Sequence, residues 1–148
     1  SVEISEPRPE DFAGMVPLCQ TGHVAGPIAQ AGASLTAESL MAMCQSRGMV
    51  ALVAREDMQV IGVLICGIAE GGNQVQCLSI AQGQDQHHLE RTMIDKLLIK
   101  LHSRGIHTVQ LPAAVQEEGN LWEAAKWEGR CDLQGEIPIG KSQSCSVV

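Results

Sequence analysis

Aromatic side chains are almost missing from this sequence. Its 148 residues include two tryptophans, one phenylalanine and no tyrosine. A hydrophobic core must therefore be filled by aliphatic side chains, methionine and cysteine. The lack of tyrosine also excludes any reaction in which a tyrosine of this chain serves as the acid.

Positive charge is scarce as well, because ten Lys and Arg residues face seventeen Asp and Glu residues, for a net charge of −7. A protein that binds nucleic acid needs a basic face, so we expect no nucleic-acid partner. We expect no secretory signal peptide, and the sequence has no apolar run of about 18 residues, the length that a membrane span needs. We therefore expect an intracellular, cytoplasmic protein without a membrane span.

The six cysteines form no C-x-x-C pair and show no zinc-site spacing. Most lie in apolar runs, such as Cys66 after Leu64 and Ile65, which is typical of buried, reduced thiols in a reducing compartment. His87 and His88 are adjacent, and adjacent side chains on a helix point about 100° apart. Since no further ligands lie nearby in the sequence, we predict no metal site.

The length of the chain fits one domain, and its hydrophobic periodicity predicts an α/β fold. The clearest helix begins near Leu89 and ends at Gly105, with one apolar stripe. We expect strands at residues 2–5, 49–54, 60–68, 74–81, 106–111 and 133–137, helices at 9–19, 36–47, 89–104 and 121–127, and a loop at 21–34. This pattern predicts a mixed, mainly antiparallel sheet of about six or seven strands flanked by four helices.

Two features of the order define the topology that we expect. The strands between residues 49 and 81 are joined by short turns and should form an antiparallel meander. The long helix then makes a right-handed crossover, so the fourth and fifth strands should be parallel neighbours. We expect a single domain over residues 1–137 and a flexible, serine-rich tail over residues 138–148.

This order of elements resembles the GNAT superfamily of N-acetyltransferases over residues 2–137. Three segments carry the resemblance: the strand Gln-Cys-Leu-Ser-Ile-Ala at residues 76–81, the helix that follows it, and the stretch from Asn120 to Gly129, which is similar to the family's last helix. The resemblance implies a GNAT-like (acyl-CoA N-acyltransferase) fold with acetyl-CoA or CoA as ligand. It also implies the amine of a small molecule or a protein as acyl acceptor.

The family's coenzyme loop precedes the long helix and reads Arg or Gln, two residues, Gly, one residue, Gly or Ala. There the helix start and small residues accept the pyrophosphate. The matching positions here are Asp85, His88 and Glu90, whose acids oppose a pyrophosphate and favour a self-capped helix. Two alternatives stay open: a weakened or lost coenzyme site, or a shifted loop. In the shifted loop, Gly83 allows the close approach, and Gln84, His87 and His88 are the candidate contacts.

The resemblance also implies that the pantetheine arm of the coenzyme lies along the strand at residues 76–81. Leu78 and Ile80 would then offer main-chain N–H and C=O groups, one of which could polarise the thioester carbonyl. Glu70 is the candidate general base, although an acid beside two glycines is also typical of a solvated turn. Cys77 is either a thiol near this cleft or a buried core residue. The position of the family's tyrosine acid is Ala125.

Two hypotheses of function follow from these observations. One is an acetyl-CoA-dependent N-acyltransferase-like domain with a weakened or lost coenzyme site. The other is a non-catalytic, GNAT-shaped module that binds a protein partner, forms a homodimer or acts as a regulatory domain. An enzyme should keep an open gap between the fourth and fifth strands, whereas a module should have that gap filled.

Overall fold

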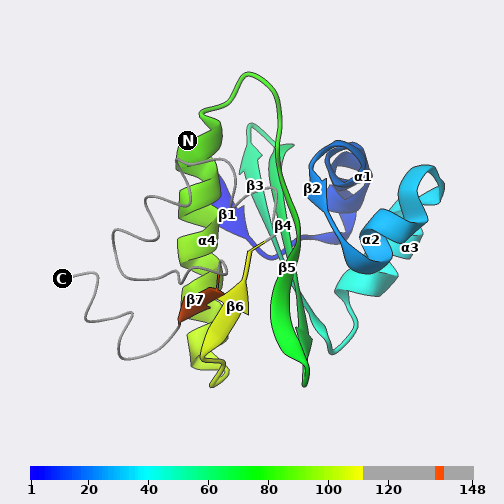
Figure 1. Ribbon diagram of the computed structural model, residues 1–148. Helices are drawn as coiled ribbons and strands as arrows, with labels where there is room; N and C mark the ends of the chain where they lie inside the picture. Colours follow the sequence, from blue (N-terminus) through cyan, green and yellow to red (C-terminus); the bar gives the residue numbers. More distant parts are fainter. Residues whose placement is uncertain (112–135, 139–148) are drawn as a thin grey trace.

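The computed structural model describes residues 1–111 and 136–138 (Figure 1). The elements follow the chain in this order: β1 (Glu3–Ser5), η1 (Pro9–Asp11), α1 (Phe12–Thr21), β2 (His23–Val24), α2 (Gly26–Ala31), η2 (Gly32–Ser34), α3 (Ala37–Cys44), β3 (Met49–Glu56), β4 (Gln59–Ala69), β5 (Gly72–Ile80), α4 (Gln86–Ser103), β6 (Thr108–Gln110) and β7 (Glu136–Pro138).

The described strands form one seven-stranded sheet, ordered β1-β3-β4-β5-β6-β7, with β2 paired to β5 off this path. The three central strands are antiparallel, and β5 and β6 are parallel neighbours. The β3–β4 turn places Asp57 and Met58 at positive φ angles of 52° and 66°. Two such residues form a turn whose twist matches that of the flanking strands, so the meander closes tightly.

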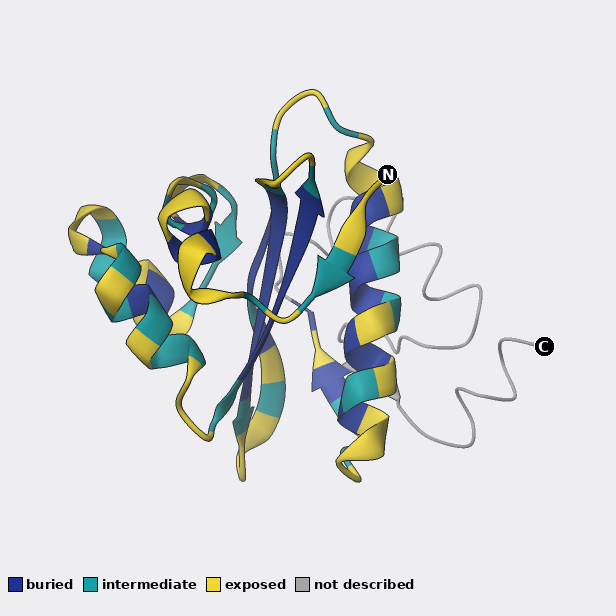
Figure 2. Cartoon of the chain, turned by 180° about the vertical axis from the view of Figure 1, so that it is seen from behind, coloured by how far each residue is buried: buried dark blue, intermediate teal, exposed yellow. Residues whose placement is uncertain are grey.

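Helices cover both faces of the sheet (Figure 2). On one face, α4 packs its Leu97 and Leu98 against Leu64 and Leu78 of the sheet. On the other face, α1, α2 and α3 enclose a second core around Val63, Ile65 and Cys77. Because the central strands are buried on both faces, they consist of near-continuous apolar runs.

The mixed, mainly antiparallel fold and the parallel pairing of the strands on either side of α4 are as predicted from the sequence. The loop predicted at residues 21–34 is wrong, because this stretch contains β2, α2 and η2. β2 is held by pairing with a strand that lies far away in the sequence, which local composition does not reveal.

Helix α4 begins at Gln86, earlier than predicted, because Asp85 serves as its N-cap residue. His87 and His88 therefore lie in the first turn of the helix. The last strand is described at Glu136–Pro138, antiparallel to β6. The helix predicted at residues 121–127, with Ala125, lies outside the described residues, as does most of the tail predicted at residues 138–148. No helix of the described part is long and apolar enough to cross a membrane.

Candidate functional site

The parallel strands β5 and β6 are joined by a single residue pair, Gln74 with Gln110. Beyond that pair, β5 continues to Ile80 while β6 has ended. The outer edge of β5, which faces away from β4, is therefore free of β6 over its second half. The resemblance to GNAT proteins implied this edge as the position of the pantetheine arm.

Strand β2 lies on this edge of β5. His23 pairs with Leu78 and Val24 pairs with Cys77, in antiparallel register. The next residue, Ala25, donates its N–H to the C=O of Gln76 at 2.8 Å. The edge of β5 at Leu78, predicted to bind the coenzyme, is thus paired with the chain's own backbone.

Glycines on both sides of β2 allow it to lie against β5. A Cβ atom added to Gly22 would overlap the side chain of Ser79. Gly26 has a φ of +60° and packs against the side chain of Gln76, which has its Oε1 atom buried without a hydrogen-bond partner among the described residues. Only glycine combines this φ with such a close approach. The sequence analysis missed β2. The signal available in the sequence was the pair of glycines, Gly22 and Gly26, that flank it.

The start of α4 brings together the predicted loop residues. The Asp85 carboxylate accepts a hydrogen bond from the N–H of His88 at 3.4 Å, so the helix is capped by its own acid, as predicted. His87 Nδ1 lies 3.3 Å from Glu90 Oε1, and the Glu90 side chain is only 1% exposed. The helix start therefore carries the exposed carboxylate of Asp85, with the buried Glu90 just after the first turn, and negative charge at this place opposes a second anion.

Gly83 and Gln84 lie just before this helix. Gly83 sits in an exposed turn at a φ of +86°, with no atom within 4 Å of an added Cβ. Gln84 lines a cavity of about 610 Å³ together with Glu10 and Val60, residues of η1 and β4. Gln84 therefore lies on the α1 side of the sheet. The cavity that it lines does not include Leu78.

Glu70 and Ile80 lie near opposite ends of β5. Glu70 is exposed in the turn between β4 and β5, before the first residue of β5. At about 3.3 Å per residue, the stretch of β5 from Gly72 to Leu78 spans about 20 Å. The fold does not bring the candidate base together with the start of α4.

The thiol of Cys77 is fully buried, 3.8 Å from the thiol of Cys19. Its hydrogen bond to Cys19 and its burial raise the pKa of Cys77 well above the ordinary value. Such a thiol stays protonated and packs as a small apolar group. The four cysteines of the described part, Cys19, Cys44, Cys66 and Cys77, are all free, and no three His, Cys, Asp or Glu residues there are grouped to hold a metal ion.

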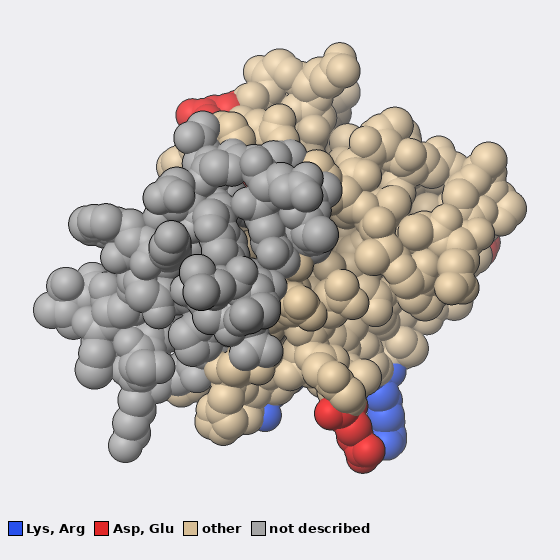
Figure 3. Space-filling model, in the orientation of Figure 1, with Lys and Arg blue, Asp and Glu red and all other residues tan. Residues whose placement is uncertain are grey.

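Charged side chains are few on the described part of the face that bears β5 in front (Figure 3). Figure 3 shows that, in the described part of this face, the Lys, Arg, Asp and Glu residues lie at its margins. A coenzyme pyrophosphate is usually held by cations together with a free helix start. The pairing of β2 with β5 and the acids Asp85 and Glu90 are the described features of this site that bear on a bound coenzyme.

Neither a protein-family model nor a curated protein matches this sequence. Solved structures do match it. The ribosomal-protein-S18-alanine N-acetyltransferase from Escherichia coli has a TM-score of 0.65 at 14% identity, covering 95% of this chain and 96% of that chain. The PaiA N-acetyltransferase from Thermoplasma acidophilum, solved in complex with coenzyme A, has a TM-score of 0.63 at 15% identity, covering 95% and 99%.

A third similar structure is the ribosomal-protein-alanine N-acetyltransferase from Brucella melitensis biovar Abortus 2308. It has a TM-score of 0.61 at 21% identity, covering 84% of this chain and 89% of that chain. The matches extend over most of both chains, at identities that speak for the fold alone. With the strand order and the crossover helix described above, they show that this chain has the fold of the GNAT N-acetyltransferases.

Proposed function

We propose that this chain is an N-acyltransferase-like domain whose coenzyme A site is lost, and that it acts by binding a protein partner. The pairing of β2 with β5 carries this proposal. His23 and Leu78 share the strand edge that a pantetheine arm would need for its main-chain hydrogen bonds. An arm could take this position only after β2 had left it.

The start of α4 supports the same conclusion. Asp85 already uses its carboxylate to cap the helix, and the carboxylate of Glu90 lies buried just after the first turn. A free helix start attracts a phosphate through its N–H groups and its partial positive charge. Here the cap fills that role, and the added negative charge opposes a second anion.

A thermal shift experiment with free CoA and with acetyl-CoA tests this proposal. A ligand that binds only the folded state at 100 times its Kd stabilises it by about 2.7 kcal/mol, which is a rise of several degrees in Tm. We expect no rise at about 1 mM of either compound, a concentration far above a typical Kd for a cofactor. The PaiA protein from Thermoplasma acidophilum, solved with coenzyme A, serves as the positive control. A clear rise with both compounds would overturn the proposal.

The second candidate function is an active N-acetyltransferase. It is favoured by the edge of β5 beyond Leu78, where no described strand pairs, and by the coenzyme A complexes among the similar structures. β2 contains only two residues, so it could be displaced at modest cost. Release of free thiol from acetyl-CoA, measured with a panel of small amines and peptides, separates this candidate from the first.

A further inference from the structure

The outer edge of β3 is only half covered. β1 pairs with Val53, Ala54 and Arg55, at the C-terminal end of β3. Along Met49 to Leu52 no described strand lies on this side, although β4 pairs with the whole of β3 on the other side. An edge of this kind presents backbone groups to which another strand can bind.

The alternation of the strand identifies the groups that face outward. Ile68 donates its N–H to the C=O of Gly48 at 2.8 Å, so Gly48 points toward β4. Residues of an antiparallel strand alternate in direction, which turns Met49 and Ala51 to the outer edge. The N–H of Met49 is already bonded to Ser46 C=O at 3.2 Å. No strand of the described part pairs with Ala51 on this side, so its outward N–H and C=O are the groups offered to a new partner.

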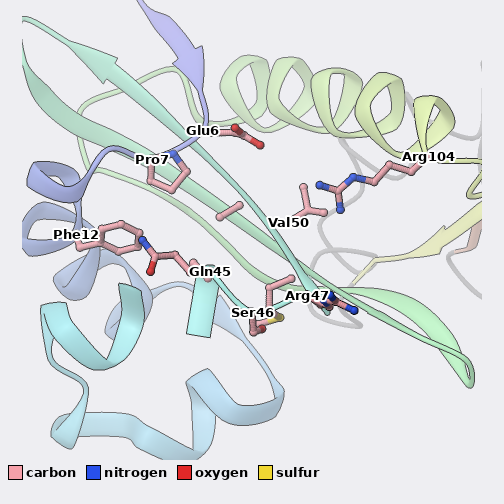
Figure 4. Close-up of a pocket in the computed structure, with 11 residues that line it drawn as sticks. Glu6, Pro7, Phe12, Gln45, Ser46, Arg47, Val50 and Arg104 are labelled. Atoms are coloured by element: carbon pink, nitrogen blue, oxygen red, sulfur yellow. The ribbon is translucent and has the colours of Figure 1, made fainter. Parts of the chain in front are cut away.

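A cavity of about 500 Å³ lies along this stretch of β3. Figure 4 shows Phe12 and Gln45 on the side of α1 and α3, and Arg104 reaching in from the end of α4. Met49, Val50 and Ala51 belong to the floor. The cavity is therefore a groove beside a strand edge, with a helix wall on each face of the sheet.

Two arginines give the groove a positive charge. Arg47 follows α3 and Arg104 ends α4, and both line the cavity. Within residues 1–111 and 136–138, neither forms an ion pair. The lining acid, Glu6, is paired with Lys100 Nζ at 2.5 Å, and that contact, together with a smaller contribution from the charge of Arg104, lowers the pKa of Glu6.

We propose that this groove binds an extended segment of a partner protein that carries two carboxylates, added as a strand to the edge of β3. An added strand gains main-chain hydrogen bonds from Ala51 and points its side chains alternately to the two faces of the sheet. Arg47 follows α3, which packs on one face of the sheet, and Arg104 ends α4, which packs on the other face. The two acids therefore stand an odd number of residues apart, as in a Glu-Asp pair.

The groove is separate from the coenzyme edge, because β4 lies between β3 and β5. The inference names the partner surface for the proposed function but does not depend on the loss of coenzyme A. Binding of CoA would overturn the proposed function and leave the groove unaffected. Failure of the peptide experiments below would overturn the groove alone.

The first experiment measures the binding of a labelled peptide by fluorescence anisotropy. The probe is the synthetic, acetylated octapeptide Ser-Val-Thr-Glu-Asp-Val-Thr-Ser, and the control peptide has Gln-Asn in place of Glu-Asp. We expect saturable binding of the probe and at least about tenfold weaker binding of the control, since each hydrogen bond between charged groups adds about that factor. Equal binding of the two peptides, or no binding of the probe, would overturn the proposal.

The second experiment removes the arginines from the protein. We expect Arg47→Gln and Arg104→Gln each to weaken binding of the probe by about tenfold. Lys96→Gln is the matched control, because it removes one positive charge from an exposed site on α4 outside the groove. The two arginine variants should bind the Gln-Asn peptide like the wild type. If neither arginine variant changes the affinity for the probe, the groove is not the binding site.

The third experiment tests the strand geometry without altering the protein. Two probes carry N-methyl groups on alternate residues, one set on the even positions and one on the odd positions. In a bound strand only one set of N–H groups faces β3, so one methylated peptide should lose binding and the other should keep it. Hydrogen exchange of the Ala51 amide should slow with the probe bound. If both methylated peptides bind alike and this amide is unaffected, the segment does not add to β3 as a strand.

Discussion

Arg55 binds Asp11 through two hydrogen bonds, from Nε to Oδ1 at 2.9 Å and from Nη2 to Oδ2 at 2.5 Å. The side chains are 7% and 5% exposed. The same guanidinium also contacts Glu3 at 2.6 Å and the hydroxyl of Ser5 at 2.7 Å. This one side chain of β3 therefore holds both β1 and the start of α1 against the sheet.

Replacement of Asp11 should destabilise the fold strongly. Asp11→Ala leaves the buried guanidinium of Arg55 without its main partner, and loss of one member of a buried pair costs about 3–5 kcal/mol. Urea denaturation followed by circular dichroism measures this loss. The neighbouring exposed acid provides the control, since Glu10→Gln should change stability by less than about 0.5 kcal/mol. Similar losses in the two variants would show that the Asp11–Arg55 pair contributes no more to the free energy of unfolding than an exposed acid does.

The same pair makes the stability of the fold depend on pH. The hydrogen bond from Arg55 lowers the pKa of Asp11 below that of an unfolded aspartate, which is about 3.9. The stabilisation is therefore complete above about pH 4 and is lost as the pH falls through the folded pKa. Urea midpoints measured from about pH 6 down to pH 2 should fall less steeply for Asp11→Asn than for the wild type. Parallel curves would exclude Asp11 as a source of the acid sensitivity.

The close approach of Gly22 to Ser79 predicts a specific coupling. Gly22→Ala should cost about 1–3 kcal/mol, because the new Cβ overlaps the serine side chain. Ser79→Gly in the same chain makes room for it, so the double variant should recover part of that loss. Gly71→Ala is the control, with open space around its Cβ and no positive φ. Strictly additive losses in the double-mutant cycle would mean that β2 does not pack on β5 in solution.

The coenzyme loop and β2 should act as two separate barriers to coenzyme A. We expect the loop variant Asp85→Gln, His88→Gly, Glu90→Gly to remain unable to bind CoA in isothermal titration. Further addition of Ala25→Pro removes the N–H that bonds Gln76 C=O, frees the edge of β5 and should permit binding. Binding by the loop variant alone would show that the acids, and not β2, exclude the coenzyme.

The thiols of the partly buried Cys44 and the buried Cys66 should react slowly. Burial raises the pKa of Cys44 and of Cys66 to about 12 in each case, so at pH 8 only about one thiol in ten thousand is ionised. Alkylation by iodoacetamide, followed peptide by peptide in a mass spectrometer, should label both residues slowly in native protein and rapidly in urea. Rapid labelling of Cys66 in native protein would show that β4 opens without global unfolding.

Much of the fold follows from local patterns in the sequence. The apolar runs of β3, β4 and β5 and the stripe of Leu89, Met93 and Leu97 on α4 define their elements, because burial requires a fixed spacing of apolar residues. The glycine-containing turns define the meander in the same way. The acids at Asp85 and Glu90 already argued against a phosphate site, and the cap that Asp85 forms follows from its place before a helix.

The tertiary structure alone decides how the strand edges are used. No local pattern shows that His23 lies beside Leu78, because two residues of strand are stable only through a partner more than fifty positions away. The same holds for Arg47 and Arg104, which line one groove because β1 stops short of the start of β3. A sequence determines its elements through short-range periodicity, whereas pairing at an edge depends on which distant backbone groups the folded chain leaves without partners.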